Sequence, residues 1–295
     1  MSNIELSSSG YFADIRLKGG GLNSLTFDGR NLIEPYLDHG VNRYSGDILA
    51  PWPNRIRDGK YSYQGKNYEL EITEPARLNA LHGLVNNGLW DLVSKSPTSA
   101  ELSYVLQKSD QFPSSIKFQI KYELSLEGLL IEISAKNTGE NPAPYGVSIH
   151  PYLVADSQSK VDDWFLKLPA GDFFCVDEVR LLPTHVEPVP SHLDFRELQQ
   201  IRDTFIDHAF LIDENLDSQR IEILSPSGYG VAMSFSKDLN WIQVHTADRE
   251  GGPDSRRSLA IEPMSCPPDA FNSGIDLIHL LPNETKSSFW RIFAL

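Results

Sequence analysis

The chain has 295 residues, 40% of them hydrophobic and 22% charged, so it is long enough and apolar enough to bury a substantial core. It carries 40 acidic residues against 26 basic ones, and the formal net charge of -14 would repel nucleic acid and anionic membrane surfaces. We therefore expect no nucleic-acid partner and no membrane partner, and a neutral small-molecule ligand instead.

The two cysteines, Cys175 and Cys266, are far apart in the sequence, and neither belongs to a Cys-x-x-Cys pair or a Cys/His ligand spacing. The sequence thus predicts neither a disulfide framework nor a zinc site. The N-terminal stretch MSNIELSSSGYFADI lacks the basic start and apolar core of a secretory signal, and no apolar run approaches ~20 residues. We expect a soluble, cytoplasmic protein.

In chain order, a first pair of strands is expected at Lys60 to Ile72, around the turn Gln64-Gly65. The strongest signal follows at 116–126, where hydrophobic residues at every second position share one face of a strand: Ile116, Phe118, Ile120, Tyr122, Leu124 and Leu126. Glu127-Gly128 interrupts this alternation, which resumes at Leu129 to Ala135. The pattern is typical of an antiparallel hairpin.

The rest of the chain continues in the same way, with strand and turn units at Arg220 to Phe235 and at Ser288 to Ala294. One short helix is expected at Asp194 to Arg202, where Asp194 can cap the first turn and Phe195, Leu198 and Ile201 share a face. None of the proline-rich loops is long enough to be an interdomain linker. The sequence therefore predicts an all-β fold, a single antiparallel β-sandwich domain over residues 1–295.

Two of the histidines stand beside residues that restrict the backbone. Gly83 after His82 permits close backbone approach, and Pro151 after His150 fixes the chain direction, so both imidazoles could be held toward a pocket. Taken alone, either could equally be a hydrogen-bonded structural histidine. No His-x-His or His-Glu-x-x-His motif occurs, so no metal site is predicted.

Two carboxylates have apolar neighbours. Glu262 ends the apolar stretch Leu259 to Ile261 and precedes Pro263, and Asp207 lies between Ile206 and the segment His208 to Phe210. Partial burial raises the pKa of a carboxylate and suits it to take a proton from a sugar hydroxyl. Taken alone, either acid could be a solvated residue at a strand edge.

The segment Pro51 to Ile56 places Trp52, Asn54 and Arg55 within a few residues. Aromatic rings stack on the apolar face of a pyranose, while amide and guanidinium groups donate hydrogen bonds to its hydroxyls. Alternatively, Trp52 is a core residue and Arg55 pairs with one of the many acids. Phe271, taken alone, also favours a place in the core.

Five short motifs, in this order from about residue 10 to the end of the chain, resemble those of the aldose 1-epimerase (galactose mutarotase) family. They are Leu49-Ala50-Pro51-Trp52-Pro53-Asn54-Arg55-Ile56-Arg57-Asp58-Gly59, Leu81-His82-Gly83, His150-Pro151-Tyr152, Asp207-His208-Ala209-Phe210, and Glu262-Pro263 followed by Pro268-Asp269-Ala270-Phe271-Asn272. No single motif is decisive, but the five together in this order make a strong combined signal. The resemblance implies a β-supersandwich in which distant strands place these residues in one open cleft.

The resemblance also implies a reaction. A glutamate matching Glu262 removes the proton of the C1 hydroxyl of a free aldose, and a histidine matching His150 protonates the ring oxygen, so that the opened sugar can reclose as the other anomer. The two groups would face each other across a pyranose-sized gap. His82 would hydrogen-bond near the ring oxygen, Arg55 would hold a hydroxyl near C1 or C2, and Asp207 would anchor distal hydroxyls. The remaining expected binding residues are Asn54, Trp52, Tyr152 and Phe271, and no cofactor is required.

The motifs depart from the better-known galactose mutarotases in Pro-Trp-Pro-Asn before Arg55 and in His150-Pro151-Tyr152, where His followed by Ser-Tyr-Phe is expected. These differences indicate a bacterial side branch and leave the sugar open, of glucose or galactose type. A relative in the superfamily acts on hexose 6-phosphates, and Arg55, Arg57 and Arg77 could bind the phosphate, although the overall acidity argues against it.

Two further readings stay open. A non-catalytic carbohydrate-binding protein would keep the aromatic and arginine contacts but would need neither His150 nor Glu262. A glycoside hydrolase or lyase would use Asp207 and Glu262 as a carboxylate pair, with the carboxyl groups ~5–10 Å apart. The sequence leaves the oligomeric state open.

Overall fold

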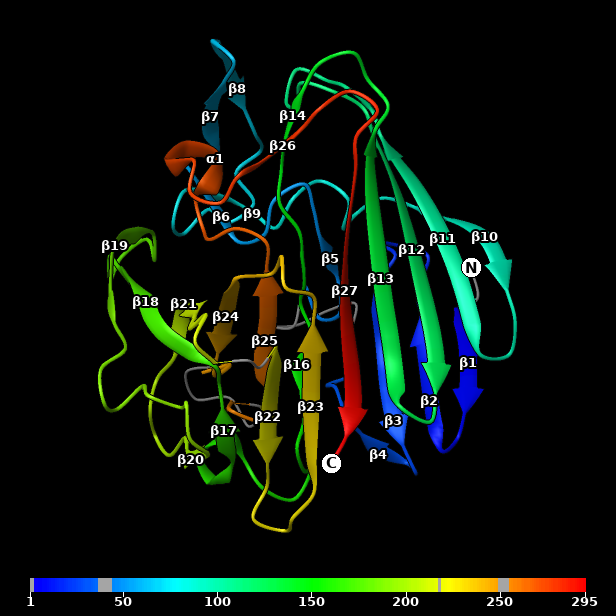
Figure 1. Ribbon diagram of the computed structural model, residues 1–295, viewed down its shortest axis with the longest axis vertical. Helices are drawn as coiled ribbons and strands as arrows, with labels where there is room; N and C mark the ends of the chain where they lie inside the picture. Colours follow the sequence, from blue (N-terminus) through cyan, green and yellow to red (C-terminus); the bar gives the residue numbers. More distant parts are fainter. Residues whose placement is uncertain (1–2, 37–43, 217–218, 249–254) are drawn as a thin grey trace.

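Antiparallel strands account for most of the protein in its computed structural model, which describes residues 3–36, 44–216, 219–248 and 255–295 (Figure 1). The periodicity of the sequence explains these strands. Along β12 (Ile116–Ser125) buried residues alternate with exposed or half-buried ones, because successive side chains of a strand point to opposite faces. The predicted all-β, antiparallel architecture is confirmed.

The largest sheet has nine strands and extends across the molecule (Figure 1). In spatial order they are β10 (Asp91–Lys95), β11 (Ser99–Leu106), β12, β13 (Gly128–Asn137), β27 (Thr285–Ala294), β23 (Gly230–Phe235), β22 (Arg220–Leu224), β17 (Phe165–Lys167) and β20 (Gln199–Gln200). The last strand of the chain, β27, lies between β13 and β23 and so joins the two halves of this sheet.

Two smaller sheets cover the nine-stranded one. The first consists of β1 (Ile4–Ser8), β2 (Tyr11–Ile15), β3 (Leu22–Phe27) and β4 (Arg30–Asn31). The second has the order β16 (Tyr152–Leu153), β25 (Leu259–Met264), β24 (Trp241–His245), β21 (Asp207–Ile212), β18 (Ala170–Val176) and β19 (Pro183–Pro188). Contacts of β1 and β2 with β12 join the first layer to the large sheet, and a 3.1 Å hydrogen bond from Trp290 Nε1 in β27 to the carbonyl of Pro263 in β25 joins the second. The result is a sandwich.

Four short strand pairs and two short helices complete the described part of the chain. The pairs are β5 (Ile48–Leu49) with β15 (Ser148–Ile149), β6 (Arg55–Arg57) with β9 (Asn79–Leu81), β7 (Lys60–Tyr63) with β8 (Lys66–Glu69), and β14 (Ala143–Tyr145) with β26 (Ile278–Leu280); the helices are α1 (Ala270–Ser273) and the 3-10 helix η1 (Val161–Asp163). A 2.7 Å hydrogen bond from the Asp269 N–H to the Arg55 carbonyl ties β6 to the segment that follows β25.

The predicted hairpins at 60–72, 116–135 and 220–235 are confirmed. In the central hairpin the register pairs Ile120 with Ile133 and Tyr122 with Ile131, so the alternating hydrophobic residues of both strands share the buried face. Leu126 was placed on this face wrongly. It lies in the turn and is 77% exposed.

The helix expected at 194–202 is wrong. Gln199 and Gln200 form β20 and pair with β17, and Leu198 is exposed while Phe195 and Ile201 are buried, so these side chains share no helical face. Asp194 does accept a hydrogen bond from the Arg196 N–H, at 3.2 Å, but it caps only a turn. Pairing with a sheet edge has overridden a weak local preference for helix.

The main hydrophobic cluster draws on strands from both ends of the chain, from Ile4 in β1 to Ile292 in β27. It contains the indole rings of Trp90, Trp164 and Trp290, all fully or nearly fully buried. Within the described ranges, no helix is long and apolar enough to cross a membrane.

Gly83 permits a close backbone approach that shapes the loop after β9. It has a φ of +82°, and a Cβ added there would lie 2.0 Å from the carbonyl oxygen of Ala50. Gly65, in the turn between β7 and β8, has a φ of +76° but open space around it.

We predict that Gly83→Ala lowers the free energy of unfolding by about 2–5 kcal/mol. This figure is the sum of the cost of a left-handed backbone conformation for alanine and the cost of the steric clash with the Ala50 carbonyl oxygen. Gly65→Ala is the matched control and should cost only about 1–2 kcal/mol. Urea denaturation of both variants measures the difference. Equal losses in the two variants would contradict this explanation of Gly83.

Candidate active site

One face of the six-stranded sheet gathers the two carboxylates singled out by the sequence and two further polar side chains. The register pairs Gln243 of β24 with Glu262 of β25, and Asp207 of β21 with His245 of β24. Residues paired across an antiparallel ladder point to the same side, and positions two apart on one strand share that side. Glu262, Gln243, Asp207 and His245 therefore project from one face.

His150 reaches this face from the loop after β15. Its backbone N–H donates to the Asp47 carbonyl at 3.0 Å, and its carbonyl accepts from the Gly46 N–H at 2.8 Å. These two bonds aim the imidazole at β25, where His150 Nε2 lies 3.3 Å from Glu262 Oε1. The two residues that were expected to act together are thus brought together, but in direct contact rather than across a pyranose-sized gap.

His82 is held by a reciprocal pair of hydrogen bonds with Asn54. The His82 N–H donates to the Asn54 carbonyl at 2.9 Å, and the Asn54 N–H donates to His82 Nδ1 at 3.2 Å. Both residues have a positive φ, 64° for His82 and 58° for Asn54, which lets the two loops meet. Because Nδ1 accepts a hydrogen bond, the neutral ring carries its proton on Nε2 and can donate it to a ligand.

Aromatic rings pack around the two imidazoles. The centroid of Tyr44 lies 4.6 Å from His82 and 6.4 Å from His150, and that of Tyr152 lies 5.1 Å from His150. The imidazoles themselves meet edge to face, with centroids 5.0 Å apart. A hollow lined in part by Tyr44 and Gly83 opens beside His82.

Arg55 is fixed by a bidentate ion pair with Glu74, from Nε at 2.9 Å and from Nη2 at 3.0 Å. Glu74 also accepts hydrogen bonds from Arg77, at 3.1 Å, and from Asn79, at 3.0 Å. Burial alone would lower the pKa of Arg55, but its hydrogen bonds with Glu74 and the charges of nearby acids raise it overall. Arg55 is therefore a rigid, permanently charged donor.

Asp207 lies at the start of β21, two strands away from Glu262. Its Oδ1 accepts a 2.7 Å hydrogen bond from Gln243 Nε2, and its Oδ2 lies 4.0 Å from His245 Nδ1. Gln243 is buried and stands between the two carboxylates on the sheet face. The near neighbour of Glu262 is therefore an imidazole, and the second carboxylate is separated from it by the intervening strand.

Burial sets the charge states of the central pair. It raises the pKa of Glu262 well above the usual value, with a further rise from the charge of Asp207 and an opposing effect of Arg55. Burial also lowers the pKa of His150, to about 3. A neutral carboxylic acid beside a neutral imidazole is the resting state that follows, with one proton between Oε1 and Nε2. Transfer of that proton creates a carboxylate base and an imidazolium acid.

Two atoms of this pair lack partners. Among the described residues, His150 Nδ1 and Glu262 Oε2 are buried and form no hydrogen bond, as is also true of Trp52 Nε1. An unsatisfied buried polar atom costs free energy, and the exceptions in folded proteins call for an explanation. A polar ligand that reaches this pair would satisfy them.

Trp52 and Phe271 are too deeply buried for their ring faces to stack on a sugar. They are 2% and 4% exposed, and their rings pack edge to face with centroids 5.5 Å apart. Tyr152, by contrast, contacts His150 directly.

Several residues of the site were not singled out by the sequence analysis, namely Tyr44, Glu74, Gln243 and His245. The two-residue spacing of Gln243 and His245 on a strand is a signal that could have found them once Glu262 was chosen. Tyr44 and Glu74 come from loops, whose course the local sequence does not predict.

Comparisons with known proteins identify the family and the fold of the chain. The family model for aldose 1-epimerase matches residues 2–292. The Escherichia coli protein YihR, whose function is uncharacterised, is 37% identical over 299 residues, which cover 99% of this chain and 92% of that protein. A galactose mutarotase of Sus scrofa is 25% identical over 236 residues, covering 75% of this chain and 67% of the mutarotase.

Solved structures show the same fold. A GalM/aldose epimerase homologue from C. elegans superposes with a TM-score of 0.86 at 21% identity, over 100% of this chain and 98% of the other. A putative aldose 1-epimerase from Escherichia coli K12 gives a TM-score of 0.85 at 22% identity, over 100% and 99%. With the family model matching nearly its whole length, this chain belongs to the aldose 1-epimerase family.

Proposed function

We propose that this protein is an aldose 1-epimerase that interconverts the α and β anomers of a free hexose of glucose or galactose type. The observation that carries the proposal is the buried contact between His150 Nε2 and Glu262 Oε1, at 3.3 Å, whose outer atoms Nδ1 and Oε2 are left without partners. Perturbed pKa values in such a pair are typical of catalytic groups.

The contact distance suits the chemistry. The C1 hydroxyl oxygen and the ring oxygen of an aldose are bonded to the same carbon, so a base for the first and an acid for the second must be close neighbours. As a carboxylate, Glu262 takes the C1 hydroxyl proton while the electron pair of that O–H bond forms the C1 carbonyl. The bond from C1 to the ring oxygen breaks, and its electron pair takes the proton of the His150 imidazolium.

The open-chain aldehyde then rotates about the C1 to C2 bond. The C5 hydroxyl attacks the other face of the C1 carbonyl, His150 takes the proton of this hydroxyl, and Glu262 donates its proton to the C1 oxygen. Each cycle leaves the pair as it started, with no net proton change and no need for a cofactor. A positioned acid and base of this kind typically contribute ~10²–10⁴-fold each, which is sufficient for a reaction that already proceeds in water.

The neighbouring residues supply binding. Burial lowers the pKa of His82 well below its usual value, so a neutral His82 would donate its Nε2–H toward the ring oxygen. Arg55, locked by Glu74, would hold a hydroxyl near C1 or C2, and Asp207 would accept hydrogen bonds from distal hydroxyls. We assign Tyr152 to the wall of the sugar site and Asn54 to the positioning of Arg55 and His82.

Trp52 and Phe271 also contribute to sugar binding in this proposal, but not by stacking a ring face on the sugar, because both rings are buried. The unpartnered Nε1 of Trp52, rather than its ring face, is the group available to a sugar hydroxyl. Phe271 would support Trp52 from below through the contact of their rings.

A non-catalytic carbohydrate-binding protein is less well supported. Recognition of a sugar needs donors, acceptors and ring faces, but it gains nothing from burying a carboxyl group against an imidazole, since burial of ionisable groups costs free energy. The Glu262–His150 pair therefore favours an enzyme.

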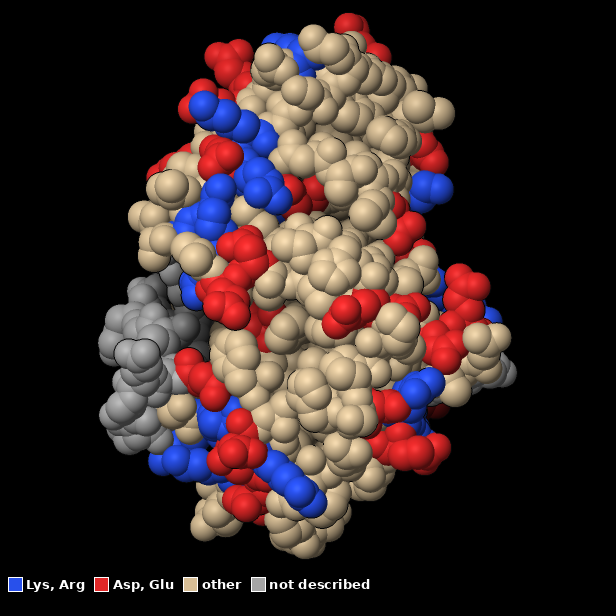
Figure 2. All heavy atoms as spheres, turned by 90° about the vertical axis from the view of Figure 1, so that its left-hand side faces the viewer, with Lys and Arg blue, Asp and Glu red and all other residues tan. Residues whose placement is uncertain are grey.

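A hexose 6-phosphate is also disfavoured as substrate, because each candidate arginine already has an acidic partner. Arg55 and Arg77 share Glu74, and Arg57 lies 3.4 Å from Asp269. On the face shown in Figure 2, basic side chains lie among acidic ones and form no broad basic patch. A phosphate would meet the repulsion of these acids.

We predict that Glu262→Gln and His150→Asn each slow the mutarotation of freshly dissolved α-D-glucose and α-D-galactose by ~10²–10⁴-fold in kcat, because each removes one of the two proton-transfer groups. Polarimetry measures the rates. Glu127→Gln, at an exposed ion pair with Arg291, is the matched control and should keep the wild-type rate. A wild-type rate no faster than buffer on any free aldose would end the proposal, as would variants that match the wild type.

The pH profile gives a second test. The mechanism needs one proton on the Glu262–His150 pair, and this proton is lost to solvent as the pH rises through the elevated pKa of Glu262, so kcat/KM should fall there. Asp207→Asn removes a negative charge that raises this pKa, so the alkaline limb of the profile should move to lower pH, whatever the effect of the substitution on the absolute value of kcat/KM. Asp28→Asn, in the turn after β3, should leave the limb in place. A limb that stays fixed or moves to higher pH in Asp207→Asn would contradict the assignment of Glu262.

Substrate charge gives a third test. Because Arg55, Arg57 and Arg77 already pair with acidic residues, kcat/KM for glucose should exceed kcat/KM for glucose 6-phosphate by at least about tenfold. This ratio corresponds to roughly 1.4 kcal/mol in transition-state binding. Polarimetry on the two sugars, each freshly dissolved as one anomer, provides the ratio. Equal or greater efficiency on the phosphorylated sugar would show that the arginines exchange their partners for phosphate.

A further inference from the structure

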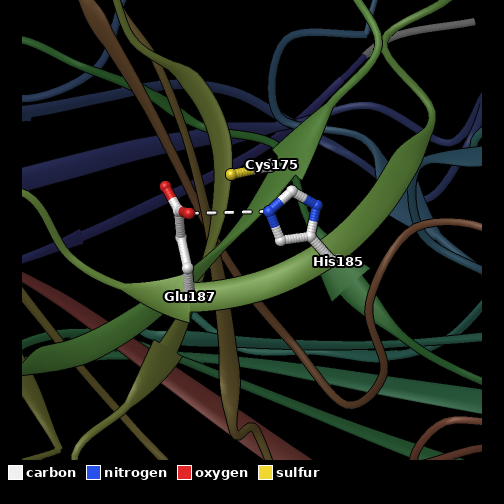
Figure 3. A group of neighbouring side chains, drawn as sticks. All are labelled: Cys175, His185 and Glu187. Atoms are coloured by element: carbon white, nitrogen blue, oxygen red, sulfur yellow. Dashed lines mark ion pairs between the residues drawn. The ribbon is translucent and has the colours of Figure 1, made fainter.

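The β18–β19 hairpin carries three side chains of types that can ligate a metal ion on one face of the sheet, namely Cys175, His185 and Glu187 (Figure 3). Cys175 of β18 pairs with His185 of β19, and Glu187 follows His185 by two positions, so all three point to the same side. Their ligand atoms all lie within 4.8 Å of one another. The sequence spacing, with Cys175 and His185 separated by a turn, does not reveal this group, and pairing across the hairpin creates it.

The spacing fits a tetrahedral metal ion. His185 Nε2 lies 3.5 Å from Glu187 Oε2. Two ligand atoms at about 2.0–2.1 Å from a tetrahedral zinc ion are roughly 3.4 Å apart, so these two need almost no movement. The side chains of His185 and Glu187 are 63% and 45% exposed, so rotation can bring them onto the sulfur of the half-buried Cys175.

Thr184 sets the tautomer of His185. Its hydroxyl donates to the Cys175 carbonyl at 3.0 Å, so its oxygen is left to accept the Nδ1–H of His185, at 3.1 Å. The lone pair of His185 then lies on Nε2, the atom that faces Glu187. A hydrogen bond of this kind to the second ring nitrogen is the usual support of a metal-bound histidine.

We propose that Cys175, His185 and Glu187 bind a divalent transition-metal ion of the zinc type, with water as the fourth ligand. Thiolate, imidazole and carboxylate together suit zinc or cobalt and do not suit magnesium or calcium. Binding displaces the thiol proton of Cys175 to solvent, so the affinity rises with pH. This assignment departs from the sequence analysis, which predicted no metal.

The metal site is separate from the proposed catalytic pair. Phe173, two residues before Cys175, pairs with Phe210, whose side chain lies on the opposite face of the sheet from Ala209 and Gln243. The ion would therefore lie on the far face, at the outer strand β19, where it would fasten that strand to β18. Catalysis would proceed without it, so this proposal and the proposed function can fail independently.

Cobalt(II) serves as the probe, because a thiolate ligand gives it a charge-transfer band in the near ultraviolet. The whole chain, stripped of metal with chelator and reduced, should develop this band and saturate at one equivalent. Cys175→Ser should abolish the band, and His185→Gln should weaken binding by more than about tenfold. Thr184→Val removes both hydrogen bonds of the Thr184 hydroxyl, to the Cys175 carbonyl and with His185 Nδ1, and should weaken binding roughly 10–100-fold.

Cys266→Ala is the matched control, since Cys266 is the other cysteine and is buried away from the hairpin. It should retain the band and the stoichiometry. Far-ultraviolet circular dichroism checks that each variant keeps its sheets. The absence of a charge-transfer band in the wild type, or a band that survives in Cys175→Ser or disappears in Cys266→Ala, would overturn the proposal.

Discussion

The burial of Glu262 against His150 is the constraint on which the rest of the site depends. Each side chain is excluded from water, so a lone charge on either one is costly, and the pair holds a single proton between Oε1 and Nε2. Moving that proton from Glu262 Oε1 to His150 Nε2 turns a neutral pair into a carboxylate base and an imidazolium acid. The apolar setting thus keeps both groups ready at neutral pH without a permanent charge.

The fold delivers this contact through rigid elements. Glu262 projects from β25, which pairs with β24 along its length and with β16 at Leu259 and Ala260, so the strand that carries the acid is held from both sides. His150 is aimed by backbone bonds to Gly46 and Asp47, and His82 by its exchange of bonds with Asn54. Loops that begin and end on the sandwich therefore place the imidazoles, while the sheet face places the acids. Sites held in this way are more exact than sites on unsupported loops.

Part of this arrangement could be predicted from the sequence because its causes are local. The alternation at 116–135 specifies a hairpin, and the apolar run before Glu262 specifies a buried strand, although this strand continues past the acid to Met264. The helix at 194–202 failed because the long-range pairing of Gln199 and Gln200 with β17 outweighs local preference. Two contacts depend on how distant loops pack, which no local sequence pattern encodes. They are the ion pair of Arg55 with Glu74 and the direct contact of Glu262 with His150.

The protonation state of His150 in the ligand-free protein tests the central claim most directly. Nitrogen NMR of ¹⁵N-histidine-labelled protein, with His150 assigned through the loss of its signal in His150→Asn, reports whether the ring is neutral. The account predicts a neutral imidazole from about pH 8 down to about pH 5, because burial lowers the pKa of His150 to about 3. An imidazole that titrates near its ordinary value of 6.5 would contradict it.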